Sequence, residues 1–214
     1  MAKGDGKIKG GNFERDMSRE TSLYITNNKD PDAVWHTKGS GSRATIRKKT
    51  NQNNKKYEHG DLGPDDPKVN FFFDFFNLEL KTGYAKKIKN KETNSTRINQ
   101  WGVLDLIDSR QKIPIFYDFW NQVLVDSDAS GREPLLIFRR LQKEPCIAMH
   151  LDIFDCILLH TENEINFATI IVELKDYAFP IIICNMREFY KWSMGTITEN
   201  FIKKYLKKVI ERRL

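Results

Sequence analysis

Cysteine is scarce in this sequence. The 214 residues include three cysteines, Cys146, Cys156 and Cys184, which lie far apart and form no Cys-x-x-Cys pair. An odd number at such spacing argues against a disulfide framework, and the missing Cys-x-x-Cys pair argues against a structural zinc site. We expect the three thiols to behave as small buried hydrophobic groups in a reducing compartment.

Long apolar runs are also missing. No stretch of about 18 or more apolar residues occurs, and the first residues, MAKGDGKIKGG, lack the apolar centre of a secretory signal. We therefore expect no membrane association, and a soluble protein that stays inside the cell.

The chain does have enough apolar residues for a core, and an excess of positive charge. Hydrophobic residues make up 40% and aromatic residues 12% of the sequence, which argues against wholesale disorder. Lysine and arginine number 35 against 29 aspartates and glutamates, so the net charge is +6. A basic protein of this kind is compatible with a polyanionic partner such as DNA.

Residue patterns divide the chain into three parts. Residues 1–11 are rich in glycine and lysine, and we expect a flexible basic arm there. Residues 12–150 alternate between helix and strand patterns and form the predicted core domain. Residues 151–214 form a C-terminal extension of unknown role, which ends in a helix opening at Thr196.

Hydrophobic periodicity predicts the elements of the core. A stripe containing Phe13, Met17 and Tyr24 indicates a helix that begins at Asn12. Strands are expected at 33–38, 70–81, 134–138 and 146–149, and helices at about 95–108 and 115–125. This order predicts an α/β fold with a central mixed β-sheet flanked by helices, followed by a C-terminal α/β extension.

The stretch from His59 to Lys81 contains the residues of a candidate metal-dependent nuclease centre. Side chains alternate along a strand, so Glu79 and Lys81 should share one face while Leu80 points into the core. Glu79 could then bind Mg²⁺, with Lys81 beside an attacking water or a phosphate. Asp61 is the best candidate for a second carboxylate.

Other acids compete for these roles. Asp74 lies at an odd offset from the strand glutamate, so it should face away if the strand is regular. Asp65 and Asp66 lie in a predicted turn, where solvation is expected. Glu14, on the first helix, could add a third carboxylate, and Glu20 on the same helix is the alternative to it.

An acidic residue two positions before a lysine is not specific by itself. Four such triplets occur, and their acids are Asp5, Asp66, Glu79 and Glu173. The last triplet, Glu173-Leu174-Lys175, follows Asp155 at the same interval of 18 residues that separates Asp61 from Glu79. We favour the first copy because an acid-bearing helix, a Gly-Ser loop and a basic segment precede it. The second copy is interpreted as an exposed strand end.

Four motifs, taken in order, resemble the PD-(D/E)xK nuclease superfamily. They are KGGNFERDMSRE, a strand leading into GSGSR, the tripeptide GDL and a strand ending in ELK. The likeness covers roughly residues 8–150 and is closest to archaeal-type Holliday junction resolvases and related phage endonucleases. It implies a restriction-endonuclease-like αβββαβ core and an active site made of Glu14, Asp61, Glu79 and Lys81. The aspartate follows a glycine here rather than a proline.

The resemblance also implies a cofactor and partners. Asp61, Glu79, Glu14 and the Leu80 carbonyl would bind Mg²⁺ or Mn²⁺, and Lys81 would orient or activate water. A homodimer would place two such sites on paired strands of a four-way DNA junction, in recombination or repair within a bacterial cytoplasm. DNA contacts are expected from the loop and basic segment before Asp61, namely Ser40, Ser42, Arg43, Arg47, Lys48, Lys49, Lys55 and Lys56.

Three functions therefore stay open at this point. The expected one is a metal-dependent DNA endonuclease acting on branched DNA. Within the same chemistry, a restriction- or repair-type enzyme acting on duplex DNA is the alternative. A non-catalytic DNA-binding protein that retains a nuclease fold would give salt-sensitive binding without cleavage.

Overall fold

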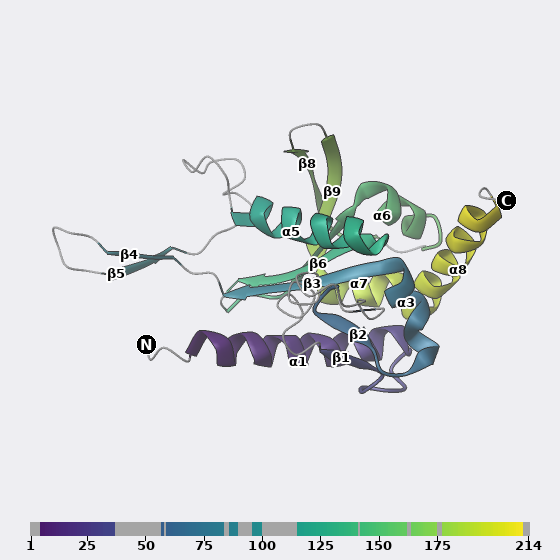
Figure 1. Cartoon of the computed structure of the whole chain (residues 1–214), viewed down its shortest axis with the longest axis horizontal. Helices are drawn as coiled ribbons and strands as arrows, with labels where there is room; N and C mark the ends of the chain where they lie inside the picture. The colour runs from purple at the N-terminus through teal and green to yellow at the C-terminus, as the bar shows by residue number, and fades with distance from the viewer. Residues whose placement is uncertain are drawn as a thin grey trace, which may run out of the picture.

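A five-stranded mixed β-sheet with helices on both faces forms the centre of the protein (Figure 1). The structure is a computed structural model that describes residues 5–36, 57, 59–83, 86–89, 96–99, 115–140, 142–161, 164–174 and 177–211. The predicted α/β fold with a flanked mixed sheet is confirmed at this level. None of the helices in these described ranges is long and apolar enough to cross a membrane.

The sheet joins strands from the predicted core and from the predicted C-terminal extension. In spatial order its strands are β3 (Phe76–Gly83), β6 (Glu133–Arg140), β7 (Cys146–His150), β9 (Tyr177–Asn185) and β8 (Phe167–Leu174). β3 and β6 are parallel, and the other pairs are antiparallel. Because β7 pairs with β9, the predicted boundary at residue 150 lies between two neighbouring strands of one sheet.

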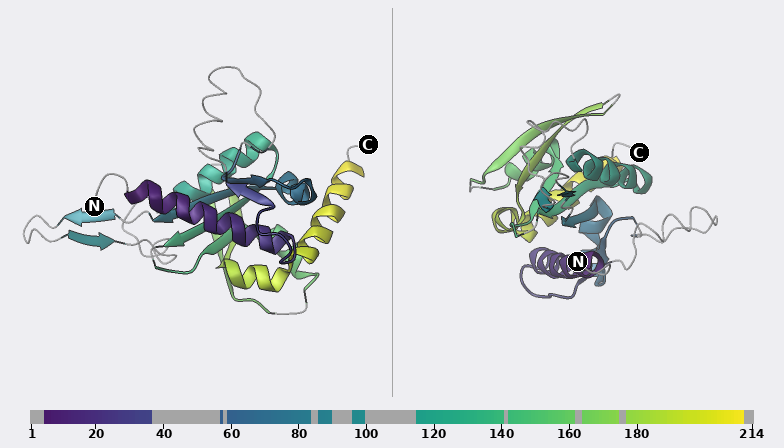
Figure 2. Two further views of the ribbon diagram at one scale, coloured as in Figure 1. Left: turned by 90° about the horizontal axis from the view of Figure 1, so that it is seen from below. Right: turned by 90° about the vertical axis from the view of Figure 1, so that its left-hand side faces the viewer.

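Helices cover each face of the sheet over a separate apolar cluster. On one face, α5 (Ile115–Ser130) packs its buried Phe116, Trp120 and Val123 against β6 and β9. On the other face, α1 (Asp5–Ile25) contributes Phe13 and Met17 to a larger cluster. That cluster also includes residues of α6 (Leu151–Leu158), α7 (Met186–Ser193) and α8 (Gly195–Glu211). Figure 2 shows α1 and α5 on opposite sides of the sheet.

The strand predicted for residues 70–81 is wrong over its first half. A 3-10 turn, η1 (Pro67–Val69), leads into a short helix, α3 (Asn70–Phe75), before β3 begins. The Asp66 carboxylate accepts a hydrogen bond from the Lys68 N–H and so caps this turn, and Pro67 stands at its first position. Consecutive phenylalanines have no period of their own, so the apolar run could not distinguish a helix from a strand.

Two further predictions need correction. The first helix begins at Asp5 rather than Asn12, so residues 5–11 of the expected flexible arm are helical. Residues 96–99, predicted as part of a helix, form strand β5 (Thr96–Asn99), which pairs with β4 (Lys86–Lys89) in a separate two-stranded sheet. The rest of that predicted helix lies outside the described residues.

The other predicted elements are confirmed with shifted ends. The short strand after the first helix is β1 (Val34–His36), which pairs with β2 (Leu62–Pro64). The helix predicted at 115–125 continues to Ser130, and the two strands predicted at 134–138 and 146–149 are β6 and β7. The terminal helix begins at Gly195, one residue before the predicted cap.

Candidate functional site

Asp61 is fixed against the outer edge of β3. Its own N–H donates to the Leu78 carbonyl oxygen at 2.8 Å, and the Leu80 N–H donates to its carboxylate Oδ2 at 2.8 Å. The chain reaches this position through Gly60, whose φ of +96° lies in the left-handed region that suits glycine. A Cβ on Gly60 would lie 2.7 Å from the Leu78 oxygen, so a side chain at this position would push Asp61 off the strand.

Glu79 and Lys81 lie on one face of β3, as strand alternation predicts. Both side chains are buried, with 4% and 7% of their surface exposed. The Lys81 ammonium donates to Glu79 Oε1, and Gln122 Nε2 on α5 donates to the same oxygen at 3.0 Å. Charged groups are rarely buried unless they are paired, so this ion pair holds both side chains in place.

Negative charge is concentrated around Glu79. Burial and, next, the neighbouring Asp61 raise the pKa of the Glu79 carboxyl to about 8, although Lys81 acts in the opposite direction. Both carboxylates thus lie close enough to repel each other in a poorly solvated place. Perturbed carboxyl groups of this kind are typical of functional sites.

Glu14, on α1, faces the same group of residues. Partial burial and then Asp61 raise the pKa of its carboxyl, while His36 and Lys81 lower it. Electrostatic coupling to Asp61 and Lys81 places Glu14 beside the site. Asp61, Glu79 and Lys81 are thus held together at β3, and Glu14 on α1 is coupled to them through its charge.

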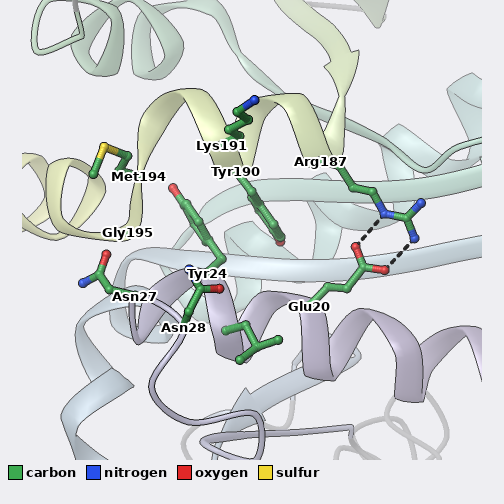
Figure 3. Close-up of a pocket in the computed structure, with 10 residues that line it drawn as sticks. Glu20, Tyr24, Asn27, Asn28, Arg187, Tyr190, Lys191, Met194 and Gly195 are labelled. Carbon is green, nitrogen blue, oxygen red and sulfur yellow. Dashed lines mark hydrogen bonds and ion pairs between the residues drawn. The ribbon is translucent and has the colours of Figure 1, made fainter.

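The alternative acid, Glu20, is engaged elsewhere. Its carboxylate forms two hydrogen bonds with Arg187 on α7, at 2.7 and 2.9 Å. The pair lines an open cavity of about 670 Å³ between α1, α7 and α8 (Figure 3). The parallel rings of Tyr24 and Tyr190, 4.0 Å apart, lie beside it. Of the two helix acids, Glu14 is therefore the one at the candidate site.

The remaining competing acids have structural partners. Asp74 accepts a hydrogen bond from Tyr57 at 2.7 Å, and it lies on helix α3, so the argument from strand alternation was wrong for this residue. Asp66 caps the turn η1, and Asp65 is exposed. Asp61 remains the acid of this segment that contacts β3.

Helix α5 supplies two residues that the sequence did not single out, Gln122 and Asp126. Asp126 lies one turn after Gln122, and burial raises the pKa of its carboxyl, whereas His59 and Lys81 lower it. A signal was present in the sequence, because Asp126 continues the apolar stripe that includes Phe119 and Val123 at helical spacing. A carboxylate on the buried side of an amphipathic helix needs a polar neighbour.

The predicted DNA-binding residues are not placed. Ser40, Ser42 and the basic residues from Arg43 to Lys56 lie outside the described residues. Leu80, whose carbonyl was a candidate ligand, is buried in β3 next to Asp61.

The carboxylates fit a hard divalent cation. Within the part of the chain that the structure describes, no three His, Cys, Asp or Glu side chains form a group that could hold a metal ion. Mg²⁺ in phosphate-processing sites commonly takes one or two carboxylates and completes its shell with water and phosphate oxygens. Asp61 and Glu79 supply such oxygens, and a cation bound to both would offset the repulsion that raises the pKa of Glu79.

Comparisons with models of protein families, with curated proteins and with solved structures find no match for this chain.

Proposed function

We propose that this protein is a Mg²⁺-dependent DNA endonuclease of the PD-(D/E)xK type, acting as a homodimer on branched DNA in the manner of Holliday junction resolvases. One observation carries the proposal. Asp61, Glu79 and Lys81 lie together at the edge strand β3, Glu14 on α1 is electrostatically coupled to Asp61 and Lys81, and the four residues follow the order of the motifs that they resemble.

The order of elements supports the same proposal. α1, β1, β2, β3, α5 and β6 follow the αβββαβ sequence of a restriction-endonuclease-like core. The turn η1 with α3, and the pair β4 and β5, are then insertions before and after the strand that carries Glu79. Of the core strands, β3 and β6 lie in the five-stranded sheet, which β7, β9 and β8 extend on the side away from the site, while β1 and β2 pair in a separate two-stranded sheet.

Each residue has a role that follows from its environment. Asp61 and Glu79 would hold the cation, with Glu14 bound to it directly or through a water. Such a cation, when bound, would supply neutralisation of the charge that develops on the phosphoryl oxygens and a lowered pKa for a water ligand. Lys81 is buried and points its ammonium at Glu79, so it can donate a hydrogen bond to a water or a phosphate oxygen next to that carboxylate.

Gln122 acts as a positioning residue in this scheme. It holds Glu79 Oε1 from the α5 side at 3.0 Å, while Lys81 holds the same oxygen from within the strand. The two donors fix the rotation of the carboxylate.

The test uses the purified protein with a labelled four-way junction and a linear duplex of the same sequence. We expect cleavage with Mg²⁺ or Mn²⁺ and none in EDTA. Asp61→Ala and Lys81→Ala should each abolish cleavage while DNA binding in EDTA persists. Asp65→Ala and Lys68→Ala are matched controls, because both residues are exposed and lie in the segment after β2. These two variants should cleave DNA like the wild type.

The outcomes separate the candidate functions. Cleavage of the junction in preference to the duplex supports a resolvase-like enzyme, and equal cleavage of both supports a restriction- or repair-type enzyme. Salt-sensitive binding without cleavage at any metal concentration would leave a non-catalytic DNA-binding protein. Full activity of both Asp61→Ala and Lys81→Ala would remove the site from the mechanism.

A further inference from the structure

We propose that the two-stranded ribbon of β4 and β5 is an arm that grips duplex DNA next to the candidate site. The choice of DNA as the partner rests on the proposed function. The inference goes further by assigning substrate binding to a particular element that lies outside the motifs of the site.

The ribbon is tied to the strand that carries the site. β3 runs through Lys81 to Gly83, and β4 begins at Lys86. Lys86 follows Lys81 by five positions in the sequence, which is a reach of at most roughly 18 Å. Both Figure 1 and the left view of Figure 2 show the ribbon projecting beyond the end of the five-stranded sheet and away from the body of the molecule.

The ribbon is strongly cationic for its size. Its two strands read KKIK and TRIN, which is four positive residues and no acid among eight. In the pairing register each cation lies opposite an uncharged residue: Lys86 opposite Asn99, Lys87 opposite Ile98, Arg97 opposite Ile88 and Lys89 opposite Thr96. Direct like-charge opposition, which would destabilise the pair, is therefore avoided.

A polyanion is the partner that this element suits. A two-stranded ribbon alone is only marginally stable, and four positive charges on it repel one another. Binding to phosphates would offset that repulsion. The major groove of B-DNA, about 12 Å wide, admits a two-stranded β-ribbon, and duplex DNA carries one negative charge for roughly every 1.7 Å of its axis.

The experiment measures binding of a fluorescent duplex by anisotropy in EDTA, so that cleavage plays no part. The ribbon variant is the triple change Lys86→Ala, Lys87→Ala and Lys89→Ala. The control variant removes the same charge from helices that do not belong to the ribbon, where Lys191, Lys203 and Lys204 are exposed on α7 and α8. Thermal unfolding of both variants checks that the fold is retained.

We expect the ribbon variant to bind at least about tenfold more weakly at 100 mM salt. The slope of log K against log salt should fall by about 2 to 3, because each lost phosphate contact removes about 0.9 from that slope. The control variant should keep both the affinity and the slope of the wild type. At saturating junction DNA the ribbon variant should keep the wild-type cleavage rate and show a raised KM.

The outcomes also keep this inference separate from the proposed function. A wild-type protein that binds DNA but never cleaves it would overturn the proposed endonuclease activity. The salt dependence of binding in the wild type and the ribbon variant would still test whether the ribbon contacts DNA. An unchanged slope and affinity in the ribbon variant would overturn the arm, whether or not the wild type cleaves. An unchanged slope together with a change in oligomeric state on gel filtration would assign the ribbon to a subunit contact instead.

Discussion

The five-stranded sheet has two edge strands, β3 and β8. β3 contains the first Glu-Leu-Lys triplet, and β8 ends with Glu173 and Leu174, the first two residues of the second triplet. In both cases an aspartate precedes the glutamate by 18 residues. β3 is buried along its length from Phe76 to Lys81, and its aspartate is hydrogen-bonded to it. β8 instead exposes Phe167 and Ile171, by 46% and 64%.

The aspartates differ in the same way. Asp61 lies in the loop before β2 and contacts the edge of β3, whereas Asp155 is exposed on helix α6. Glu173 pairs with Ala178 near the end of β8, and Lys175 lies outside the described residues. Identical spacing in the sequence thus gives one electrostatically coupled cluster and one aspartate on the solvent-exposed side of a helix. Burial and neighbours, rather than the motif, give carboxylates their chemistry.

Exchanging each glutamate for glutamine should have the largest effect. Glu79→Gln keeps the size of the side chain but removes the negative charge that would bind the cation. We expect metal-dependent cleavage to fall on the order of 10³-fold, and Glu173→Gln to cleave like the wild type. Initial rates on the four-way junction at saturating Mg²⁺ measure both. An equal loss of cleavage in Glu79→Gln and Glu173→Gln would mean that the Asp61 and Glu79 pair has no catalytic role that the Asp155 and Glu173 pair lacks.

The difference in burial between the two strands predicts unequal stability effects. Leu78 on β3 is 1% exposed within the large apolar cluster, so Leu78→Ala should lower the free energy of unfolding by about 2–5 kcal/mol. Ile171→Ala on β8 should change it by less than about 0.5 kcal/mol. Urea titrations of both variants provide the values. Comparable losses would show that β8 is covered in solution.

The glycine before Asp61 has no counterpart in the second copy, where Phe154 precedes the aspartate. Gly60→Ala should cost about 1–3 kcal/mol of stability for the positive φ and the 2.7 Å contact with Leu78 O. It should also lower cleavage on the order of 10²-fold, because Asp61 would move.

Gly131→Ala is the matched control for this change. Gly131 also has a positive φ, of +68°, but a Cβ there would meet nothing within 4 Å. We expect a smaller loss of stability, of about 1 kcal/mol, with cleavage retained. If both glycine variants cleave normally, the position of Asp61 does not depend on Gly60.

Local patterns in the sequence were sufficient for part of the site. Strand alternation placed Glu79 and Lys81 on one face, and it needed only the three residues of the triplet. The choice of Asp61 rather than Asp155 as the second carboxylate depended on the helix, the Gly-Ser loop and the basic segment that precede Asp61 in the sequence. The same alternation failed for Asp74, because a run of phenylalanines has no period that separates α3 from β3.

Contacts made by packing could not be predicted. Gln122 and Asp126 reach the site only because α5 covers the face of β3 that carries Glu79. Likewise, β8 and β9 join β7 across a predicted domain boundary, since strand pairing over long separations leaves no local signal. The helix that begins at Asp5 overrides a glycine-rich composition that favours a flexible segment.

The last prediction concerns pH, and it again separates the buried glutamate from the rest of the molecule. Burial and Asp61 raise the pKa of Glu79 from 4.5 to about 8 in the folded protein, so the folded state holds a proton that the unfolded state has lost. The stabilisation by this group is therefore present below pH 4.5 and is lost as the pH rises towards about 8. Relative to Glu79→Gln, the wild type should lose about 3 kcal/mol of unfolding free energy between pH 5 and 8, because a change of one in pKa corresponds to about 1.4 kcal/mol.

Mg²⁺ sharpens this measurement, because a metal ligand must be deprotonated. At pH 8, added Mg²⁺ should restore stability to the wild type and leave Glu79→Gln unchanged. At limiting Mg²⁺, cleavage by the wild type should rise with pH up to about 8, as the Glu79 carboxyl loses its proton. Urea titrations at each pH, with and without Mg²⁺, measure the stabilities. A constant difference between the two proteins from pH 5 to 8 would show that Glu79 is not the buried, repelled carboxylate that distinguishes β3 from β8.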